Sequence, residues 1–513
     1  MPRLHFALFA SALTLVAAVP DPVRTDAGLI SGVAGSTPEV RVFKGIPFAA
    51  PPVGDLRWRG PKAVAKWTGT RKADKFGATC MQTEYPAGSI YRSEPQPVSE
   101  DCLYLNVWTA AKTADDKRPV MVWIHGGALT RGSGSLPTYD GEELAKKGVV
   151  LVTINYRLGA FGFLAHPELT KESDHNASGN YALLDQVAAL EWVKNNIAAF
   201  GGDPNRVTIF GESAGSWSVN LMTATPLAKG LFHRAIGESG AQFSQMRKLA
   251  DAEQAGVRYA TSLQADSVAA LRSKSADEIM KTPGQFGPNV DGWMFPEDVY
   301  TTYSKGKQAD VPLLLGSNAD EGTAFTSPNT TAQGFQAMAK QRYGAKADEF
   351  LKIYPAATDE DARKSAPGAM RDQTFGWEMR TWARMQAKSG KSKSYMYYFS
   401  RVPPGPETAR YGSYHAAEIV YAFHNLGTTK RPWEETDRKL ADLMSTYWVN
   451  FATTGDPNGK NLAKWPAYDP KSDQVLELGD KVQVRANPHA PALDFLDTYY
   501  EELHKSGASG RAR

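Results

Sequence analysis

The 513-residue chain has little of several features that mark other classes of protein. Its two cysteines are too few to complete a four-ligand zinc site, and we expect neither a metal nor a cofactor. The 58 Lys and Arg residues nearly balance 55 Asp and Glu residues, without a basic block or an acidic tail, which argues against a nucleic-acid partner. Beyond the N-terminus no apolar run approaches the roughly 18 residues of a membrane span. Internal repeats and low-complexity tracts are also missing, and 42% of the residues are hydrophobic, so we expect a large globular core.

The N-terminus has the pattern of a secretory signal peptide. Positive charge at Arg3 precedes an apolar run, residues 6–16, and small residues occupy positions −3 and −1 of the expected cleavage site, Val16 and Ala18. We therefore expect residues 1–18 to be removed and the protein to be secreted or periplasmic.

Export has a consequence for the two cysteines, Cys80 and Cys102. An even number of cysteines in an oxidising compartment favours a disulfide, and closing this loop would contribute about 3 kcal/mol.

Apolar runs alternate with helical segments along the chain. The predicted strands are residues 119–125, 149–156, 206–210, 312–316 and 394–400. Residues 181–199 have apolar side chains at helical spacing, and the Gly and Pro residues of 200–204 should end that helix. Continuous apolar strands between helices predict an α/β fold with a mostly parallel central sheet and helices on both faces.

We expect one domain, residues 19–504, and a disordered tail, residues 505–513. The polar stretch 242–390 should form a helical, cap-like insertion that shapes the site.

The segment Gly211–Glu212–Ser213–Ala214–Gly215 fits the G-x-S-x-G pattern of a nucleophile elbow. It follows a predicted strand and precedes a stretch compatible with a helix, which is the context that gives this short pattern its meaning. Ser213 is therefore the candidate nucleophile of an α/β-hydrolase fold. Its hydroxyl needs a base to remove the proton.

Chain order restricts the base and the acid, because both follow the serine in this fold. His415 follows a loop-forming run after the strand at 394–400, whereas His424 is more typical of a packed residue. The acid should follow the strand at 312–316, where Asp320 and Glu321 are both candidates. Spacing alone does not distinguish these two carboxylates.

His125–Gly126–Gly127–Ala128 ends the strand at 119–125. Glycines allow the backbone to turn its N–H groups toward a ligand. With the N–H of the residue after the nucleophile, these donors would form an oxyanion hole.

Several longer segments resemble the type-B carboxylesterase family, the relatives of the cholinesterases, from about residue 23 to about residue 496. The segments that carry the resemblance are FGGDPNRVTIFGESAG (200–215), EDCLYLN (100–106), FKGIPFAAPP (43–52), GNYALLDQ (179–186) and DPNG (456–459). The absence of the further disulfides of animal members is typical of a bacterial enzyme.

The resemblance assigns roles to particular residues. Its D-E-G segment implies Glu321 as the acid, and its H-x-x-E-I segment implies His415, with Glu418 and Ile419, as the base. It implies an oxyanion hole at Gly127, Ala128 and Ala214, supporting roles for Glu212, Ser239 and Gly126, and a disulfide between Cys80 and Cys102. Many members have a third glycine where this chain has Ala128, whose methyl group should narrow the alcohol side of the pocket. Trp217 and Trp293 are candidates either for the pocket lining or for the core.

The predicted function is hydrolysis of small to medium carboxylic esters, including aromatic or bulky ones, through an acyl-enzyme, by a monomer or weak oligomer. Three alternatives remain at this point. They are a lipase acting on long-chain lipids, a specialised natural-product or polyester esterase, and a non-catalytic adhesion or scaffold protein on the same fold.

Overall fold

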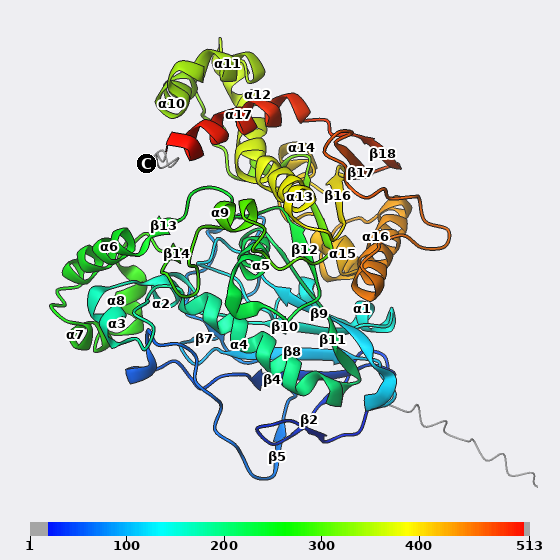
Figure 1. The fold of residues 1–513 in the computed structure, drawn as a ribbon. Helices are drawn as coiled ribbons and strands as arrows, with labels where there is room; N and C mark the ends of the chain where they lie inside the picture. The colour runs from blue at the N-terminus through cyan, green and yellow to red at the C-terminus, as the bar shows by residue number, and fades with distance from the viewer. Residues whose placement is uncertain (1–18, 507–513) are drawn as a thin grey trace, which may run out of the picture.

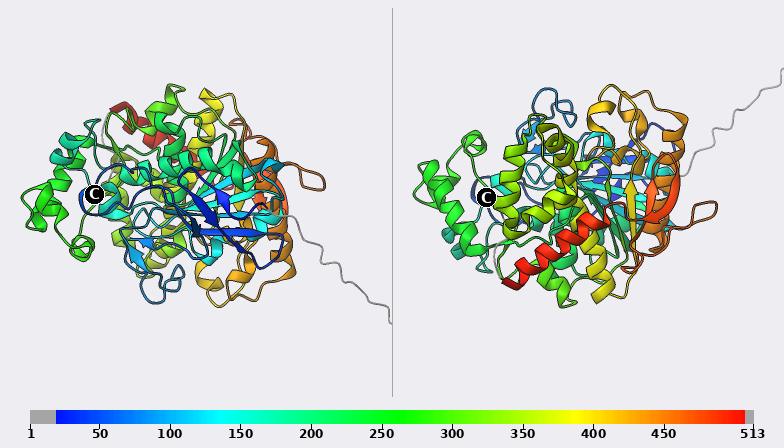
Figure 2. Two further views of the ribbon diagram at one scale, coloured as in Figure 1. Left: turned by 90° about the horizontal axis from the view of Figure 1, so that it is seen from below. Right: turned by 90° about the horizontal axis from the view of Figure 1, so that it is seen from above.

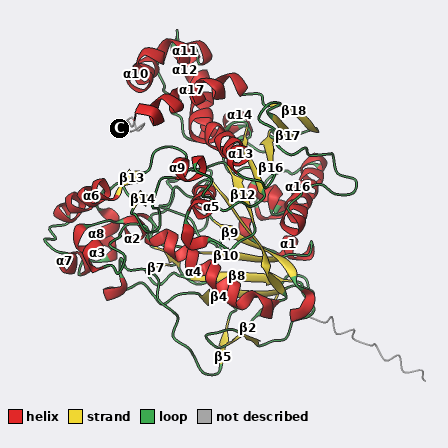
Figure 3. Ribbon diagram, viewed as in Figure 1, coloured by secondary structure: helices red, strands yellow, loops and turns green. Residues whose placement is uncertain are grey.

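A computed structural model describes residues 19–506, so the predicted signal peptide lies outside the described residues. An eleven-stranded sheet runs through the centre (Figures 1 and 3). In spatial order its strands are β18 (Val482–Ala486), β17 (Gln474–Leu478), β16 (Ser394–Phe399), β15 (Leu313–Asn318), β12 (Arg234–Glu238), β11 (Gly202–Glu212), β9 (Arg118–Ile124), β10 (Val150–Ile154), β8 (Tyr104–Thr109), β4 (Arg41–Pro47) and β3 (Val33–Ala34).

From β17 to β10 in this spatial order, each strand is parallel to its neighbour. At the two ends of the sheet, β18 pairs antiparallel with β17, and β8, β4 and β3 continue from β10 in antiparallel pairs. The central strands are buried on both faces, which explains their continuous apolar sequences. All five predicted strands are present in this sheet.

Helices cover both faces of the sheet. One face packs against α4 (Tyr181–Asn196), α5 (Ala214–Ala224), α9 (Val299–Ser304) and α13 (Trp377–Ser389). The opposite face packs against α1 (Glu142–Lys146), α15 (Ile419–Ala422) and α16 (Glu435–Thr454). The predicted helix at 181–199 is α4 followed by a short 3₁₀ turn, Ile197–Phe200, and Gly201 ends it with φ of 79°.

Stretch 242–390 differs from the predicted single insertion, because β15 divides it. Before β15 come α6 (Leu249–Ser262), α7 (Val268–Arg272) and α8 (Ala276–Lys281), which pack beside α2 (Gly159–Phe163) and α3 (Pro167–Glu172) in a separate apolar cluster. After β15 come α10 (Ala332–Tyr343), α11 (Ala347–Ile353) and α12 (Asp359–Arg371), which lie beside the C-terminal helix α17 (Ala490–Ser506) (Figures 1 and 2). Two residues of the predicted tail, 505 and 506, thus belong to α17, and the rest lie outside the described residues.

Short elements complete the chain. These are α14 (Thr408–Tyr411), a small sheet of β1 (Val23–Arg24), β2 (Leu29–Ser31) and β5 (Thr70–Lys72), and the two-stranded pairs β6 (Thr79–Cys80) with β7 (Val98–Ser99) and β13 (Arg247–Lys248) with β14 (Asn289–Val290). Cys80 and Cys102 form the predicted disulfide. It closes the base of a loop that reaches the site described next.

Candidate active site

Ser213 lies at the sharp turn between β11 and α5. Its backbone has φ of 57° and ψ of −122°, a conformation that L residues rarely adopt. The neighbouring glycines are required by close approaches: a Cβ on Gly211 or Gly215 would come within 2.5 or 2.0 Å of the carbonyl oxygen of Ile124. The local sequence therefore folds into the elbow that the G-x-S-x-G pattern predicts.

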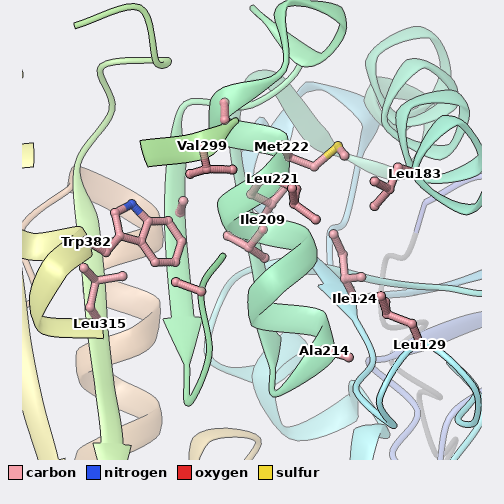
Figure 4. Close-up of a cluster of buried hydrophobic side chains, with 14 of the residues drawn as sticks. Ile124, Leu129, Leu183, Ile209, Ala214, Leu221, Met222, Val299, Leu315 and Trp382 are labelled. Carbon is pink, nitrogen blue, oxygen red and sulfur yellow. The ribbon is translucent and has the colours of Figure 1, made fainter. Parts of the chain in front are cut away.

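Helix α5 is fixed beneath this turn by apolar packing. Ile209, Leu221 and Met222 lie in the same buried cluster, with Leu315 and Trp382 on the neighbouring elements (Figure 4). Ala214, the first residue of the helix, is fully buried. The position of the serine is thus set by the core rather than by a mobile loop.

The two acidic candidates after β15 have different contacts. Glu321 is fully buried, and its Oε1 accepts hydrogen bonds from the Ser239 hydroxyl (2.5 Å) and the Asn318 N–H (2.7 Å). Its Oε2 lies 2.5 Å from Nδ1 of His415. Asp320 instead accepts a hydrogen bond from the Ser413 N–H (2.8 Å), and so fixes the loop that carries the histidine.

The imidazole of His415 lies between carboxyl groups. Its Nδ1 contacts Glu321, and its Nε2 lies 3.0 Å from Oε1 of Glu212. The Ser213 hydroxyl has no hydrogen-bond partner among residues 19–506, but Ser213 and His415 line the same cleft. Proton transfer requires the serine hydroxyl to turn toward Nε2, and catalytic hydrogen bonds commonly shorten only when substrate binds.

Aromatic side chains surround this imidazole. The ring of Phe375 stacks on it at 4.5 Å between centroids, and Phe325 contacts it edge-on at 5.1 Å. Tyr91 stacks on Phe325 and donates a hydrogen bond of 3.2 Å to the carbonyl oxygen of His415. These contacts restrict the orientation of the ring.

The predicted oxyanion donors lie at two adjoining turns. Gly127 has φ of 103° and Ala128 has φ of 55°, and neither N–H donates to an acceptor among the described residues. Ala214 is the first residue of α5, where an N–H has no partner within the helix. Gly126 is needed here because a Cβ would come within 2.7 Å of the Glu212 carbonyl oxygen. Three donors are therefore available to stabilise a negatively charged oxygen.

Three further carboxyl groups, Glu212, Glu238 and Glu418, are buried in or near the site. Burial, together with Glu321 and Glu238, raises the pKa of Glu212 well above its usual value. Burial likewise raises the pKa of Glu238 and of Glu418. These shifts favour the neutral, protonated forms near pH 7, because ionised carboxylates would be poorly solvated there.

Beside Ser213 opens a cleft of about 800 Å³. Three segments supply most of its walls: residues 85–96, residues 126–139 and residues 414–433. From stretch 242–390, Phe325 lines the cleft and Phe375 stacks on His415, and the wider role of this stretch in shaping the site stays a prediction.

Other candidates lie away from the cleft. Trp217 packs against the core, and Trp293 stacks on His175 at 3.7 Å in a separate cavity. His424 lies 3.6 Å from Glu143 rather than near the serine.

Sequence reasoning gave no role to two residues that position the site, Asn318 and Phe375. Asn318 is the last residue of β15, and its N–H donates to Glu321, so its place at the strand end was a usable signal. No local pattern indicates that Phe375 contacts His415.

The part of the chain that the structure describes lacks two features. None of the helices between residues 19 and 506 combines the length and the apolar character that crossing a bilayer needs. The same stretch contains no cluster of three or more His, Cys, Asp or Glu side chains placed to bind a metal ion.

The parallel sheet, the elbow, and the Glu–His pair beside free backbone donors define a serine hydrolase with the α/β-hydrolase fold. The chain belongs to the carboxylesterase family, whose model, described as "Carboxylesterase family", matches residues 20–496. It is thus a carboxylic ester hydrolase, and its substrate is a small-molecule ester.

Named relatives support this placement. The chain is 38% identical over 503 residues to a "Fumonisin B1 esterase" of Sphingopyxis macrogoltabida, covering 93% of this chain and 90% of the relative. It is 35% identical over 490 residues to the "Para-nitrobenzyl esterase" of Bacillus subtilis (strain 168), covering 91% and 96%. A solved structure of "PNB esterase" superposes with a TM-score of 0.80 at 32% identity, over 92% of this chain and 99% of the other.

Proposed function

We propose that this protein hydrolyses bulky or aromatic carboxylic esters through an acyl-enzyme on Ser213. His415 takes the hydroxyl proton during attack and returns it to the leaving alcohol, and Glu321 orients the imidazole. Gly127, Ala128 and Ala214 stabilise the oxyanion. Water then releases the acid by the same route. The observation that carries the proposal is the contact of 2.5 Å between Glu321 and His415 in a cleft that Ser213 also lines.

The size of the cleft supports bulky substrates. At about 800 Å³ it lies toward the upper end of the range for small-molecule sites, about 300–1,000 Å³. Tyr85, Tyr91 and Trp433 among its lining residues supply flat apolar surface for an aromatic group. Two relatives are named as esterases of fumonisin B1 and of para-nitrobenzyl esters. Four Arg and Lys side chains among the lining residues favour soluble esters over long-chain lipids.

We also propose that the enzyme is exported, to the periplasm or the medium. The charged and apolar N-terminal sequence supports this, as does the disulfide between Cys80 and Cys102.

The test of the nucleophile is the Ser213→Ala variant, assayed on p-nitrophenyl butyrate. We expect kcat to fall by about 10⁴-fold or more while KM changes little. Ser262→Ala, an exposed serine on α6, is the matched control and should retain full activity. Turnover by Ser213→Ala within tenfold of wild type would refute the assignment.

A panel of esters with one acyl group and alcohols of increasing bulk tests the substrate class. We expect kcat/KM for benzyl and naphthyl esters to exceed that for ethyl esters. A preference for ethyl esters would contradict the bulky-substrate part of the proposal and leave the mechanism untouched.

A further inference from the structure

The walls of the cleft have an uneven distribution of charge. The cationic lining residues are Arg92, Arg131, Lys430 and Arg431. The acidic lining residues are Glu94 and, beside the nucleophile, Glu212. The cations come from three segments: the disulfide-closed loop, the turn after the oxyanion glycines, and the segment that follows His415. A substrate seated on Ser213 is therefore approached by positive charge from more than one side.

Two of these cations have acidic partners that lie outside the lining. Arg92 lies 2.9 Å from Glu84, and Arg431 lies 3.6 Å from Glu407. The side chains of Glu84 and Glu407 are 59% and 45% exposed. Pairs whose carboxylate is exposed in this way are weak, because water screens the attraction, so they leave the cations able to respond to a charged ligand.

The other two cations, Arg131 and Lys430, have no carboxylate within ion-pair distance among residues 19–506. Arg131 is fixed in place by neutral groups: it donates hydrogen bonds to the carbonyl oxygen and hydroxyl of Thr83, at 3.1 and 3.0 Å, and lies 5.2 Å from the centre of the Tyr85 ring. Its own N–H donates to the Gly127 carbonyl oxygen at 3.0 Å, so it lies one turn from the oxyanion donors. A cation that is ordered but uncompensated is suited to bind an anion.

The floor of the cleft does not cancel this charge. Glu212 is buried, and its raised pKa favours the neutral carboxyl. Glu94, which is exposed, is the other acidic lining residue, so the positive charge of the four cations predominates. Clefts in which one sign of charge predominates concentrate the field and increase the rate at which ligands of the opposite sign enter.

We propose that the preferred substrates are anionic esters, in which the acyl or alcohol part carries at least one carboxylate in addition to the ester. Arg131 and Lys430 recognise that carboxylate, and Arg92 and Arg431 add to the attraction at the mouth. This inference rests on the proposed ester hydrolysis at Ser213. The charge of the substrate away from the scissile bond, rather than its bulk alone, then determines specificity.

Three p-nitrophenyl esters of equal chain length test the inference: the hexanoate, the monoester of adipic acid, and the ω-aminohexanoate. They differ at the chain end, which is neutral, anionic or cationic near pH 7. At low ionic strength we expect kcat/KM for the adipate monoester to exceed that for the hexanoate about tenfold, with the aminohexanoate lowest. Raising the ionic strength from about 0.01 M to about 1 M should reduce this ratio.

Variants identify the residues responsible. Lys430→Gln and Arg131→Gln should each lower the adipate-to-hexanoate ratio of kcat/KM by about fivefold to tenfold. Lys430 is exposed, so its replacement preserves the fold even if Arg131→Gln does not. Lys439→Gln, on the exposed face of α16, is the control and should leave the ratio unchanged.

The outcomes separate this inference from the proposed function. Turnover of the hexanoate with an adipate-to-hexanoate ratio of one or less would overturn the anionic preference and leave ester hydrolysis standing. A ratio that persists in both variants would overturn the assignment to Arg131 and Lys430. If none of the three esters were hydrolysed, the proposed function would be refuted, and this inference with it.

Discussion

Glu321 is the middle member of a short chain of hydrogen bonds that begins at Ser239 and ends at His415. Because the carboxylate is fully buried, its lone pairs need protein donors, and Ser239 and the Asn318 N–H supply them. The remaining oxygen is thereby directed at Nδ1 of the imidazole. The orientation of the imidazole thus depends on the hydroxyl of Ser239, which is fully buried.

Ser239→Ala tests this dependence. A hydrogen bond to a charged group contributes about 1.5–3 kcal/mol, so we expect kcat to fall about tenfold to hundredfold with little change in KM. Ser400→Ala removes a similar bond of 2.9 Å to Glu477, which makes no hydrogen bond to Ser213, Glu321 or His415, and is the matched control. Equal kcat values for Ser239→Ala and wild type would show that Glu321 is positioned without this hydroxyl.

Ala128 has a strained backbone conformation. Its φ of 55° is the left-handed conformation, which costs an L residue about 1–2 kcal/mol relative to ordinary backbone. The same residue lines the cleft, where we propose that its N–H is an oxyanion donor. Strain at such a position is typical of functional turns.

Ala128→Gly should therefore act on both stability and specificity. We expect the free energy of unfolding to rise by about 1 kcal/mol and kcat/KM for esters of bulky alcohols to rise relative to ethyl esters. Thermal unfolding and the ester panel measure these effects. Ala337→Gly, in the exposed part of helix α10, should instead destabilise by about 0.5–1 kcal/mol. A loss of stability at both positions would contradict the strain argument.

At the scale of elements, a π-helical segment brings an aromatic ring to the imidazole. Residues Asp372–Gly376 form this segment between α12 and α13, and Phe375 within it stacks on His415. A π-segment adds a residue to the helical turn and so changes which side chains face the sheet. Asp372 anchors it through Arg371 at 2.7 Å and the Tyr354 hydroxyl at 2.6 Å.

Phe375→Leu tests the contribution of this stacking. Aromatic pairs add about 0.5–1.5 kcal/mol, so we expect kcat to fall about twofold to tenfold, while Phe375→Tyr retains most of it. Phe335, in α10, is also buried. The variant Phe335→Leu therefore controls for a general loss of packing and should lower only the thermal stability. Identical kcat values for Phe375→Leu and Phe335→Leu would contradict a positioning role.

The elements that could be predicted are those whose signal is local. The apolar runs of β9, β10 and β11 are continuous because both faces of these strands are buried, and the elbow follows from two glycines that meet Ile124. The π-segment at 372–376 and the division of stretch 242–390 by β15 depend on packing between distant segments. No period or motif in the sequence encodes those contacts.

The same limit applies to the site. Spacing left Asp320 and Glu321 equivalent, whereas their contacts distinguish Asp320, which fixes the loop, from Glu321, which faces His415. The resemblance to a family made that choice from its D-E-G segment, and the geometry gives the physical reason. The cations that line the cleft come from loops distant in sequence. Because the whole chain is nearly neutral, its composition does not indicate that they gather in one cleft.

At the scale of the whole molecule, buried carboxyls make stability depend on pH. Glu378, on α13, accepts hydrogen bonds from the N–H groups of Phe243 (2.6 Å) and Ser244 (3.2 Å). Burial nevertheless raises its pKa from 4.5 to about 8. A raised pKa in the folded state means that its stabilising contribution is present below about pH 4.5 and is lost as the pH rises toward about 8.

Glu378→Gln removes this dependence. Between about pH 5 and about pH 9 we expect the wild type to lose at least about 1 kcal/mol of stability relative to the variant. Thermal unfolding of both proteins across this range measures the difference. Glu360→Gln, an exposed carboxylate on α12, provides the control and should follow the wild type. Parallel pH profiles for wild type and Glu378→Gln would contradict the assignment.

The central claim is that one serine among many is activated by the Glu321–His415 pair. The most direct measurement is reaction with a fluorophosphonate followed by intact-mass analysis and peptide mapping. The account predicts a single adduct, on the peptide that contains Ser213, formed far more slowly in His415→Gln. An unlabelled protein, or an adduct on any other residue, would contradict it.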